Sequence, residues 1–439
     1  MIKNFQLGII AFVLMFIPAC ATAPSIQPQV NGLVVAERFD RALDVLHKNK
    51  DGYGKNNELL YLLDEALVLH LAGRYAESIP VFEQAKLKYE QLYTKSISKG
   101  AATWLYNDYA APYYGEDFER VMINVFQALN FAVLYNYSEA LVEARDVDSI
   151  LTALNAQYAL SQKNVYREDA FARLLMGILY ETQGDLGGIN DAYISYHKAI
   201  ETYENDYRKN YKTPPPRVLI ENLLAAAQVI DPEAYKAYRA KYNVRFVPIK
   251  RKEEKAEVYL VHYNGLSPIK YQDSIVFPLP GGQISKIAFP RYQKRIFTRE
   301  KSYLTAVADN KKIFRQNTEV GEDITGIALK NLDNRKVRVM AKAILRPAGK
   351  YFAEKAAENS VRRRSGDTPA NAVRLAGGIY NIYSEQSDLR AWQTLPAEIR
   401  ISRLVLLPGE YDLKLDDLSL GHVSLKAGEK KFILKRTSR

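Results

Sequence analysis

The sequence predicts an α+β protein: an all-helical N-terminal domain, then a β-rich, sandwich-like C-terminal domain with inserted helices. Apolar residues recur at three- and four-residue spacing from about residue 34 to 242, which is the period of a helix. Short β-branched and aromatic runs begin at residue 257 and continue to the C-terminus, as in strands. The charge also changes sign: residues 20–240 hold 22 basic and 29 acidic side chains, whereas residues 241–439 hold 38 and 21.

Length and composition exclude several protein classes. The chain has 439 residues, of which 47% are hydrophobic, enough for two or three domains with buried cores. This composition argues against disordered, collagen-like and disulfide-stapled proteins. The formal net charge of +11 makes an acidic protein, anionic lipid or nucleic acid worth considering as a partner.

The N-terminus has the pattern of a lipoprotein signal. Lys3 precedes an apolar run over residues 7–17, which is too short to cross a bilayer and fits a signal peptide at 1–19. Cys20, the only cysteine, resembles the lipidated cysteine of bacterial lipoproteins. That resemblance implies a lipid anchor and a tether over 20–32, and Ala21 after the cysteine favours the outer membrane. An ordinary signal peptide with an incidental cysteine is the alternative.

Three segments of the helical domain, residues 33–242, share one template. A small residue lies three places after an aromatic or turn residue. Counted from that small residue, a bulky residue follows four places later and an alanine-like residue seven places later. The positions are Ser78, Phe82 and Ala85; Ala140, Ala144 and Val147; and Ala192, Tyr196 and Ala199, the last set after Gly177 and Tyr180. They resemble tetratricopeptide repeats, which implies paired helices with a concave binding face. A generic helical bundle is the alternative. A further pair at 217–230 and 232–242 would cap the stack.

An aromatic and charged segment separates the first two repeats. Its candidate functional residues are Tyr113, Gly115, Glu116, Asp117, Phe118, Glu119 and Arg120. Glu116 and Glu119 would suit acid–base catalysis as paired carboxylates in unlike surroundings. In the structural interpretation, which we favour, Gly115 ends a loop, Asp117 caps the next helix, and Glu119 and Arg120 form local ion pairs.

Residues 243–439 are predicted to form a basic, β-rich domain. Strands are expected at 257–263, 275–279, 284–289, 303–308, 398–406, 408–411, 421–425 and 431–435, the last three as a meander. A helical insertion is expected over about 318–385, with helices at 318–332, 337–358 and 371–383. Pro347 should kink or end the second helix. Gly377 and Gly378 in the third would permit close packing.

Taken together, these motifs resemble an uncharacterised family of bacterial tetratricopeptide-containing lipoproteins. The resemblance covers nearly all of the mature chain. It rests on Asn107-Asp108, Pro112-Tyr113-x-Gly115-Glu116-Asp117-Phe118-Glu119-Arg120, Tyr166-x-Glu168-Asp169-Ala-Phe-Ala-Arg173 and Asp388-x-Arg390-x-Trp392-x-x-Leu-Pro396-x-x-Ile399-x-x-x-Arg403-x-x-Leu-x-Pro408-Gly409. The resemblance implies the architecture and no reaction. It adds Asp388, Arg390, Trp392, Pro396 and Arg403 as candidate motif residues.

Little in the sequence supports catalysis. The five histidines are scattered, and no metal-ligand spacing, nucleophile elbow or phosphate-binding glycine loop is present, so we expect no cofactor or metal. Basic runs at 250–255, 291–301 and 362–364 would form either a solvated face or a surface for an anionic partner. A secreted, anchored protein would rarely meet nucleic acid.

The sequence therefore predicts a lipid-anchored protein of the outer membrane that faces the periplasm. Its helical repeats would bind an envelope protein of unknown identity, and its basic half would contact a second partner or an anionic surface. It would be an interaction scaffold or an assembly or regulatory factor. The alternative is an envelope hydrolase that acts on glycan or peptide with carboxylates near Glu116 and Asp117.

Overall fold

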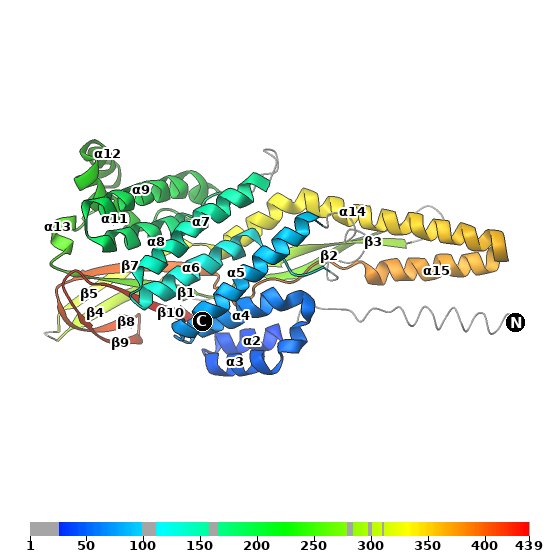
Figure 1. Ribbon diagram of the computed structural model, residues 1–439, viewed down its shortest axis with the longest axis horizontal. Helices are drawn as coiled ribbons and strands as arrows, with labels where there is room; N and C mark the ends of the chain where they lie inside the picture. The colour runs from blue at the N-terminus through cyan, green and yellow to red at the C-terminus, as the bar shows by residue number, and fades with distance from the viewer. Residues whose placement is uncertain are drawn as a thin grey trace.

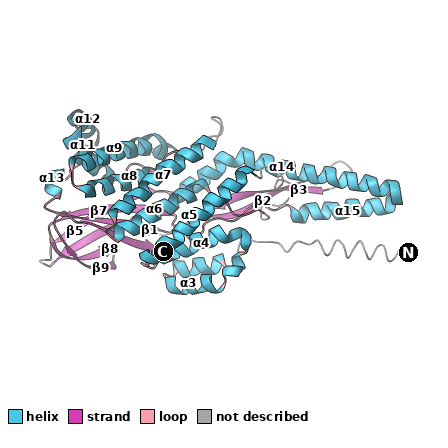
Figure 2. Ribbon diagram, viewed as in Figure 1, coloured by secondary structure: helices cyan, strands magenta, loops and turns pink. Residues whose placement is uncertain are grey.

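The computed structural model describes residues 26–98, 111–157, 166–278, 284–296, 301–309 and 311–438. The predicted signal peptide, Cys20, Asn107 and Asp108 lie outside these ranges. The molecule is elongated, with a layer of helices over a β-rich layer and a long helical arm at one end (Figure 1). Figure 2 shows that helices make up the N-terminal part and strands most of the C-terminal part. The predicted α+β class with inserted helices is confirmed.

Paired helices form the N-terminal region. The helices are α2 (Gln27–Val35), α3 (Phe39–Lys48), α4 (Glu58–Leu71), α5 (Tyr75–Ser98), α6 (Asp117–Val133), α7 (Tyr137–Gln157), α8 (Ala170–Tyr180), α9 (Leu186–Thr202), α10 (Arg208–Asn210), α11 (Arg217–Ile230), α12 (Pro232–Tyr242) and α13 (Ile249–Lys252). The first begins at Gln27, within the range expected for the tether, because Val30 and Val34 are buried in the core. The described helical region extends to Lys252.

Small residues at the template positions let paired helices approach closely. All nine template residues, from Ser78 to Ala199, are buried. The tightest approach is between α8 and α9, where a Cβ added at Gly177 would lie 2.3 Å from the ring of Tyr196. Any larger residue at Gly177 would therefore push the two helices apart.

Two four-stranded sheets form a sandwich, and a separate hairpin stands beside it. The strands are β1 (Ala256–Asn264), β2 (Ile269–Pro278), β3 (Ile284–Gln293), β4 (Tyr303–Ala308), β5 (Ile313–Asn317), β6 (Glu319–Glu322), β7 (Glu398–Leu406), β8 (Gly409–Leu415), β9 (Leu418–Leu425) and β10 (Lys430–Thr437). The sheet orders are β10-β1-β7-β6 and β5-β4-β8-β9, and β2 pairs with β3. The expected terminal meander is wrong, because β10 leaves β9 and pairs in parallel with β1 in the other sheet.

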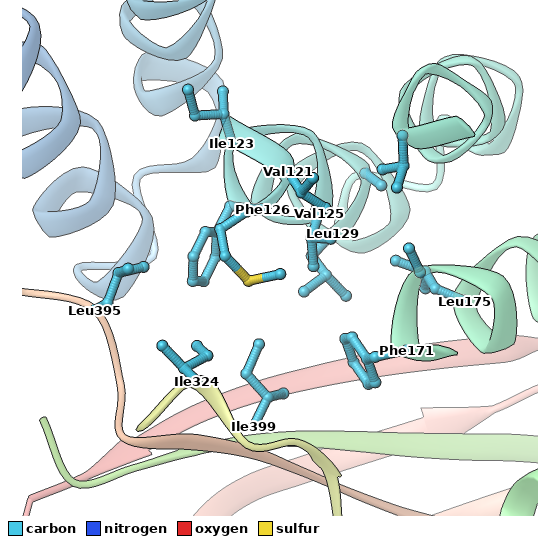
Figure 3. Packing of buried hydrophobic residues seen from close by; sticks show 14 of the residues in the cluster. Val121, Ile123, Val125, Phe126, Leu129, Phe171, Leu175, Ile324, Leu395 and Ile399 are labelled. Atoms are coloured by element: carbon cyan, nitrogen blue, oxygen red, sulfur yellow. The ribbon is translucent and has the colours of Figure 1, made fainter. Parts of the chain in front are cut away.

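One hydrophobic core joins the helical layer to the sheet beneath it. Phe126 of α6 and Phe171 of α8 lie above Ile399 of β7 (Figure 3). Alternate residues of β1 point to opposite sides: Tyr259 faces the helices, whereas Val258 enters a second cluster between the two sheets. The strand β1 is therefore buried on both faces, between the helical layer and the second sheet. The sheet that contains β1 covers the inner side of the helical layer.

The helical insertion differs from its prediction in three places, and the first is that the helices expected at 318–332 and 337–358 form one continuous helix. Residues 319–322 form the edge strand β6, so the first helix, α14 (Ile324–Ser365), begins later than expected, with Asp323 as its cap. The expected break at Pro347 is wrong, since α14 continues through it. Packing along α15 (Asp367–Ser384) and β3 outweighs the local penalty of the proline.

The arm consists of the antiparallel helices α14 and α15 with the β2–β3 hairpin beside them. The chain turns between the helices at Gly366, whose φ of 85° suits glycine. Close packing at Gly377 is confirmed, because an added Cβ there would lie 2.3 Å from the side chain of Glu354 on α14. The arm extends well beyond the sandwich and the helical layer (Figure 1).

Candidate functional site

The two long sequence motifs meet where the helical layer joins the C-terminal region. We call this place the motif junction and define it by Tyr113, Glu116, Glu119, Lys270, Arg390 and Trp392. The Trp392 backbone N–H donates to Glu119 Oε1 at 2.9 Å, and the Tyr113 hydroxyl donates to Glu119 Oε2 at 2.5 Å. Lys270 Nζ donates to Glu116 at 2.6 Å and to the Arg390 carbonyl at 3.0 Å. The junction therefore ties α6 to β2 and to the segment before β7.

Arg390 is the buried centre of this junction. Its guanidinium pairs with Asp388 at 2.7 Å and donates to Asn57 Oδ1 and the Ala111 carbonyl, each at 3.0 Å. The same group lies over the Tyr113 ring. Each of these donors is satisfied by the chain itself, so Arg390 connects segments far apart in the sequence.

Burial changes the acidity of the carboxyl groups near the junction. It raises the pKa of Glu119 to about 7, although Tyr113 and Lys270 act in the opposite direction. Burial likewise raises the pKa of Asp64 on α4 to about 6, and Thr394 and Tyr53 donate hydrogen bonds to it at 2.7 and 2.8 Å. Neutral donors lower these values without cancelling the cost of burial.

The other predicted motif residues have structural positions. Glu116, not Asp117, is the cap of α6, and Glu119 completes a capping box with it, so the expected cap is wrong by one residue. Gly115 ends the loop with a φ of 72°. Three further motif residues, Asp117, Phe118 and Pro396, are buried. Arg120 stacks on the rings of Tyr89 and Tyr93.

The carboxylates Glu116 and Glu119 are engaged by the protein's own groups. Both oxygens of Glu119 accept hydrogen bonds from Tyr113, Trp392 and the Glu116 backbone. Glu116 is bound by Lys270 and Arg335. This arrangement suits a joint between segments better than a pair of carboxyls facing a substrate.

A second buried polar site connects the same two layers. We call it the charged ring: Glu181, Lys252, Glu257 and Lys430. Glu181 pairs with Lys252 at 2.8 Å and with Lys430 at 2.9 Å. Glu257 pairs with Lys252 at 3.5 Å and also with Lys430. Arg403 of the C-terminal motif reaches Glu257 at 2.8 Å, so the ring links α13, β1, β7 and β10 to the end of α8.

The ring's carboxylates behave oppositely to those of the motif junction. Burial by itself would raise the pKa of Glu257, but Lys252, Lys430 and Arg403 outweigh it and hold the pKa well below its usual range. The pKa of Glu181 is lowered for the same reason. Residues of the ring also line a cavity of about 390 Å³, together with Tyr135, Tyr137 and Ile249.

Sequence reasoning identified Arg403 but missed the ring around it. Lys252 belongs to the basic run at 250–255, which was interpreted as an exposed surface, yet its side chain is buried. Glu257 was the available signal. It lies in a strand that is otherwise apolar and aromatic, and a charge in a doubly buried strand requires a partner.

The arm carries the most exposed apolar side chains of any described helix pair. Leu375, Ile379 and Tyr383 form a stripe at four-residue spacing on α15, and Leu375 and Tyr383 are 69% and 74% exposed. On α14, Phe352 is 70% exposed and lies eight residues from exposed Ile344. Arg362, Arg363 and Arg364 are exposed at the tip, so this predicted basic run does lie on the surface.

Neither a metal site nor a membrane span is found among the described residues. No group of three or more histidine, cysteine, aspartate or glutamate side chains in the described ranges could hold a metal ion. Likewise, each helix described is too short or too polar to cross a bilayer.

Comparisons with family models and curated proteins supply no identity for this chain. No protein-family model matches the chain. No curated protein matches it either. The resemblance to tetratricopeptide-containing lipoproteins therefore stays a prediction.

Proposed function

We propose that this protein is a lipid-anchored interaction protein of the cell envelope, attached to the outer membrane through Cys20 and facing the periplasm. It acts as a scaffold or assembly factor, without catalysis, and the arm is its main contact element. The observation that carries the proposal is the combination of exposed apolar stripes and basic charge on the arm. Exposed apolar patches of this kind mark interaction surfaces.

The positions of the sequence motifs support an interaction protein over a hydrolase. Glu116 and Glu119 are used in the motif junction, and Arg403 is used beside the charged ring. A protein partner of the helical layer would dock on the outer helices α5, α7 and α9, because the sheet covers the inner side. This refines the expectation that a concave repeat face binds the partner.

A photo-crosslinking amino acid placed in living cells tests the arm as the contact element. We expect an adduct with protein or with lipid at Leu375, which is 69% exposed, and none at Ile313 on the distant strand β5, which is 65% exposed. Equal capture at both positions, or none at Leu375, would contradict the proposal.

Membrane fractionation tests the anchor separately. After a high-salt wash, Cys20→Ala should move the protein from the membrane fraction to the soluble fraction, because the acyl chains supply the membrane affinity that salt does not weaken. Retention of this variant in the membrane pellet, also after a high-salt wash, would show that Cys20 is not the anchor.

A further inference from the structure

The arm concentrates the positive charge of the C-terminal half. Residues 324–384 contain 12 Lys and Arg side chains and only 4 Asp and Glu, a net charge of +8 in 61 residues. Residues 241–439 as a whole have a net charge of +17, so about half of it lies on two helices. Arg362, Arg363 and Arg364 place three of these charges together at the exposed tip.

Apolar side chains are exposed on the same two helices. Phe352 on α14 and Leu375, Ile379 and Tyr383 on α15 are at least half exposed. Helices that combine Lys and Arg with exposed leucine and aromatic side chains lie in the interface of anionic membranes. Tyrosine in particular favours the headgroup level, where its ring is apolar and its hydroxyl is solvated.

The charge argues against the symmetric pairing of two arms. Two arms would bring +8 against +8, and like charges at close range repel. An anchor at Cys20, in contrast, would keep a bilayer close to the body of the protein. The residues from Cys20 to the start of α2 at Gln27 span at most about 25 Å, which would hold an anchored protein against its membrane.

We infer that the arm docks on an anionic lipid bilayer: Leu375, Ile379 and Tyr383 of α15 enter the headgroup region, and Arg363 and Arg364 at the tip contact lipid phosphates. This inference rests on the proposed function, since the anchor brings the membrane within reach. A second attachment point would orient the body and leave the outer helices facing the periplasm.

Vesicle binding tests the inference without the acyl chains. The mature chain with Cys20→Ala is mixed with vesicles of phosphatidylcholine, with or without phosphatidylglycerol, and bound protein is measured by flotation. We expect binding only to the anionic vesicles, and we expect added salt to weaken it. Reversal of Arg362, Arg363 and Arg364 to glutamate should weaken binding by about a hundredfold or more.

A matched variant controls for net charge. Lys48, Lys209 and Lys236 are exposed on the helical layer, and their reversal to glutamate removes the same charge elsewhere. This variant should bind almost as well as the parent. Equal loss in both variants would show general electrostatic attraction and would overturn the docking of the arm.

Insertion of the apolar stripe has its own readout. In the protein that lacks Cys20, Leu375→Cys provides a single thiol for an environment-sensitive dye, and Ile313→Cys provides the control. We expect a blue shift of the dye at position 375 on anionic vesicles and no shift at 313. No shift at either position would overturn insertion.

The two proposals fail in different ways. If the crosslinker at Leu375 captures a protein while purified protein ignores vesicles, the lipid inference falls and the interaction function stands. An adduct of twice the protein's own mass would identify a second copy as the occupant and would also overturn the inference. If Leu375 captures neither protein nor lipid in cells, the proposed role of the arm itself falls.

Discussion

The motif junction and the charged ring join the same two layers and are both buried, but the pKa values of the carboxyl groups shift upward near the junction and downward in the ring. Glu119 of the junction and Asp64 near it accept hydrogen bonds mainly from uncharged donors, and burial raises their pKa values to about 7 and about 6. In the ring, cations outweigh burial and lower the pKa of Glu257. Neutral donors therefore leave part of the desolvation cost unbalanced, whereas nearby cations offset it.

The two sites contribute to stability in different pH windows. Glu119 has a pKa of 4.5 in the unfolded chain and about 7 in the fold. Its contribution to the free energy of unfolding is therefore full below pH 4.5 and is lost as pH rises from 4.5 to 7. Glu257 and Glu181 have lowered pKa values in the fold. Their contribution is present above their unfolded pKa and is lost as pH falls through the folded value.

The largest effect is expected from breaking the ring. Glu257→Gln leaves Lys252, Lys430 and Arg403 buried with too little negative charge, and should lower the free energy of unfolding by about 3–5 kcal/mol. Denaturant titration at neutral pH measures this. Glu254→Gln is the control, because Glu254 lies three residues away and is exposed. Equal midpoints for the two variants would show that the ring adds no stability.

A pH-dependent effect is expected at the motif junction. In the parent, Glu119 takes up a proton on folding, which lowers the free energy of unfolding by about 3 kcal/mol as pH rises from 4.5 to 7. Glu119→Gln removes this group, so the free energy of unfolding of the variant should not show that decrease. Denaturant titrations across this range, with exposed Glu139→Gln as control, measure the slope. An unchanged slope would mean that folding does not raise the pKa of Glu119.

A double-mutant cycle sharpens the comparison further. Lys430→Met combined with Glu257→Gln removes one cation along with its carboxylate partner. The double variant should be more stable than the sum of the single changes predicts, by about 2 kcal/mol, because fewer charges remain unpaired. Simple additivity would contradict direct pairing of these two residues.

The smallest effect is expected from removing one neutral donor. Tyr113→Phe deletes the hydroxyl that donates to Glu119 and should cost about 1 kcal/mol in the free energy of unfolding. It should also raise the pKa of Glu119 further. Tyr114→Phe is the control, since Tyr114 is exposed. A loss as large as that of Glu257→Gln would show that neutral donors matter as much as cations.

Local patterns predicted much of the fold. The helices at 217–230 and 232–242 and the strands at 303–308 and 398–406 have the bounds that the sequence indicated. Asp231 illustrates the reason, because its side chain accepts a hydrogen bond from the Ala234 backbone and starts α12. Such signals lie within a few residues of the element that they determine.

The missed elements depend on neighbours far away in the sequence. The edge strands β5 and β6 are short, and pairing with β4 and β7 defines them. The helix α14 continues through Pro347 because α15 and β3 pack along it. No local pattern contains that information.

The sequence by itself determined the helix pairs, most strands, and the residues of two long motifs, because periodicity, caps and small residues act locally. Only the tertiary structure decided that those motifs meet at Glu119 and Trp392, and that β10 lies beside β1. It also decided which buried carboxylates have cations next to them. Lys430 and Glu181 are 249 residues apart in the chain but 2.9 Å apart in the fold. Electrostatic pairing depends on distance in space, and sequence separation does not reveal that distance.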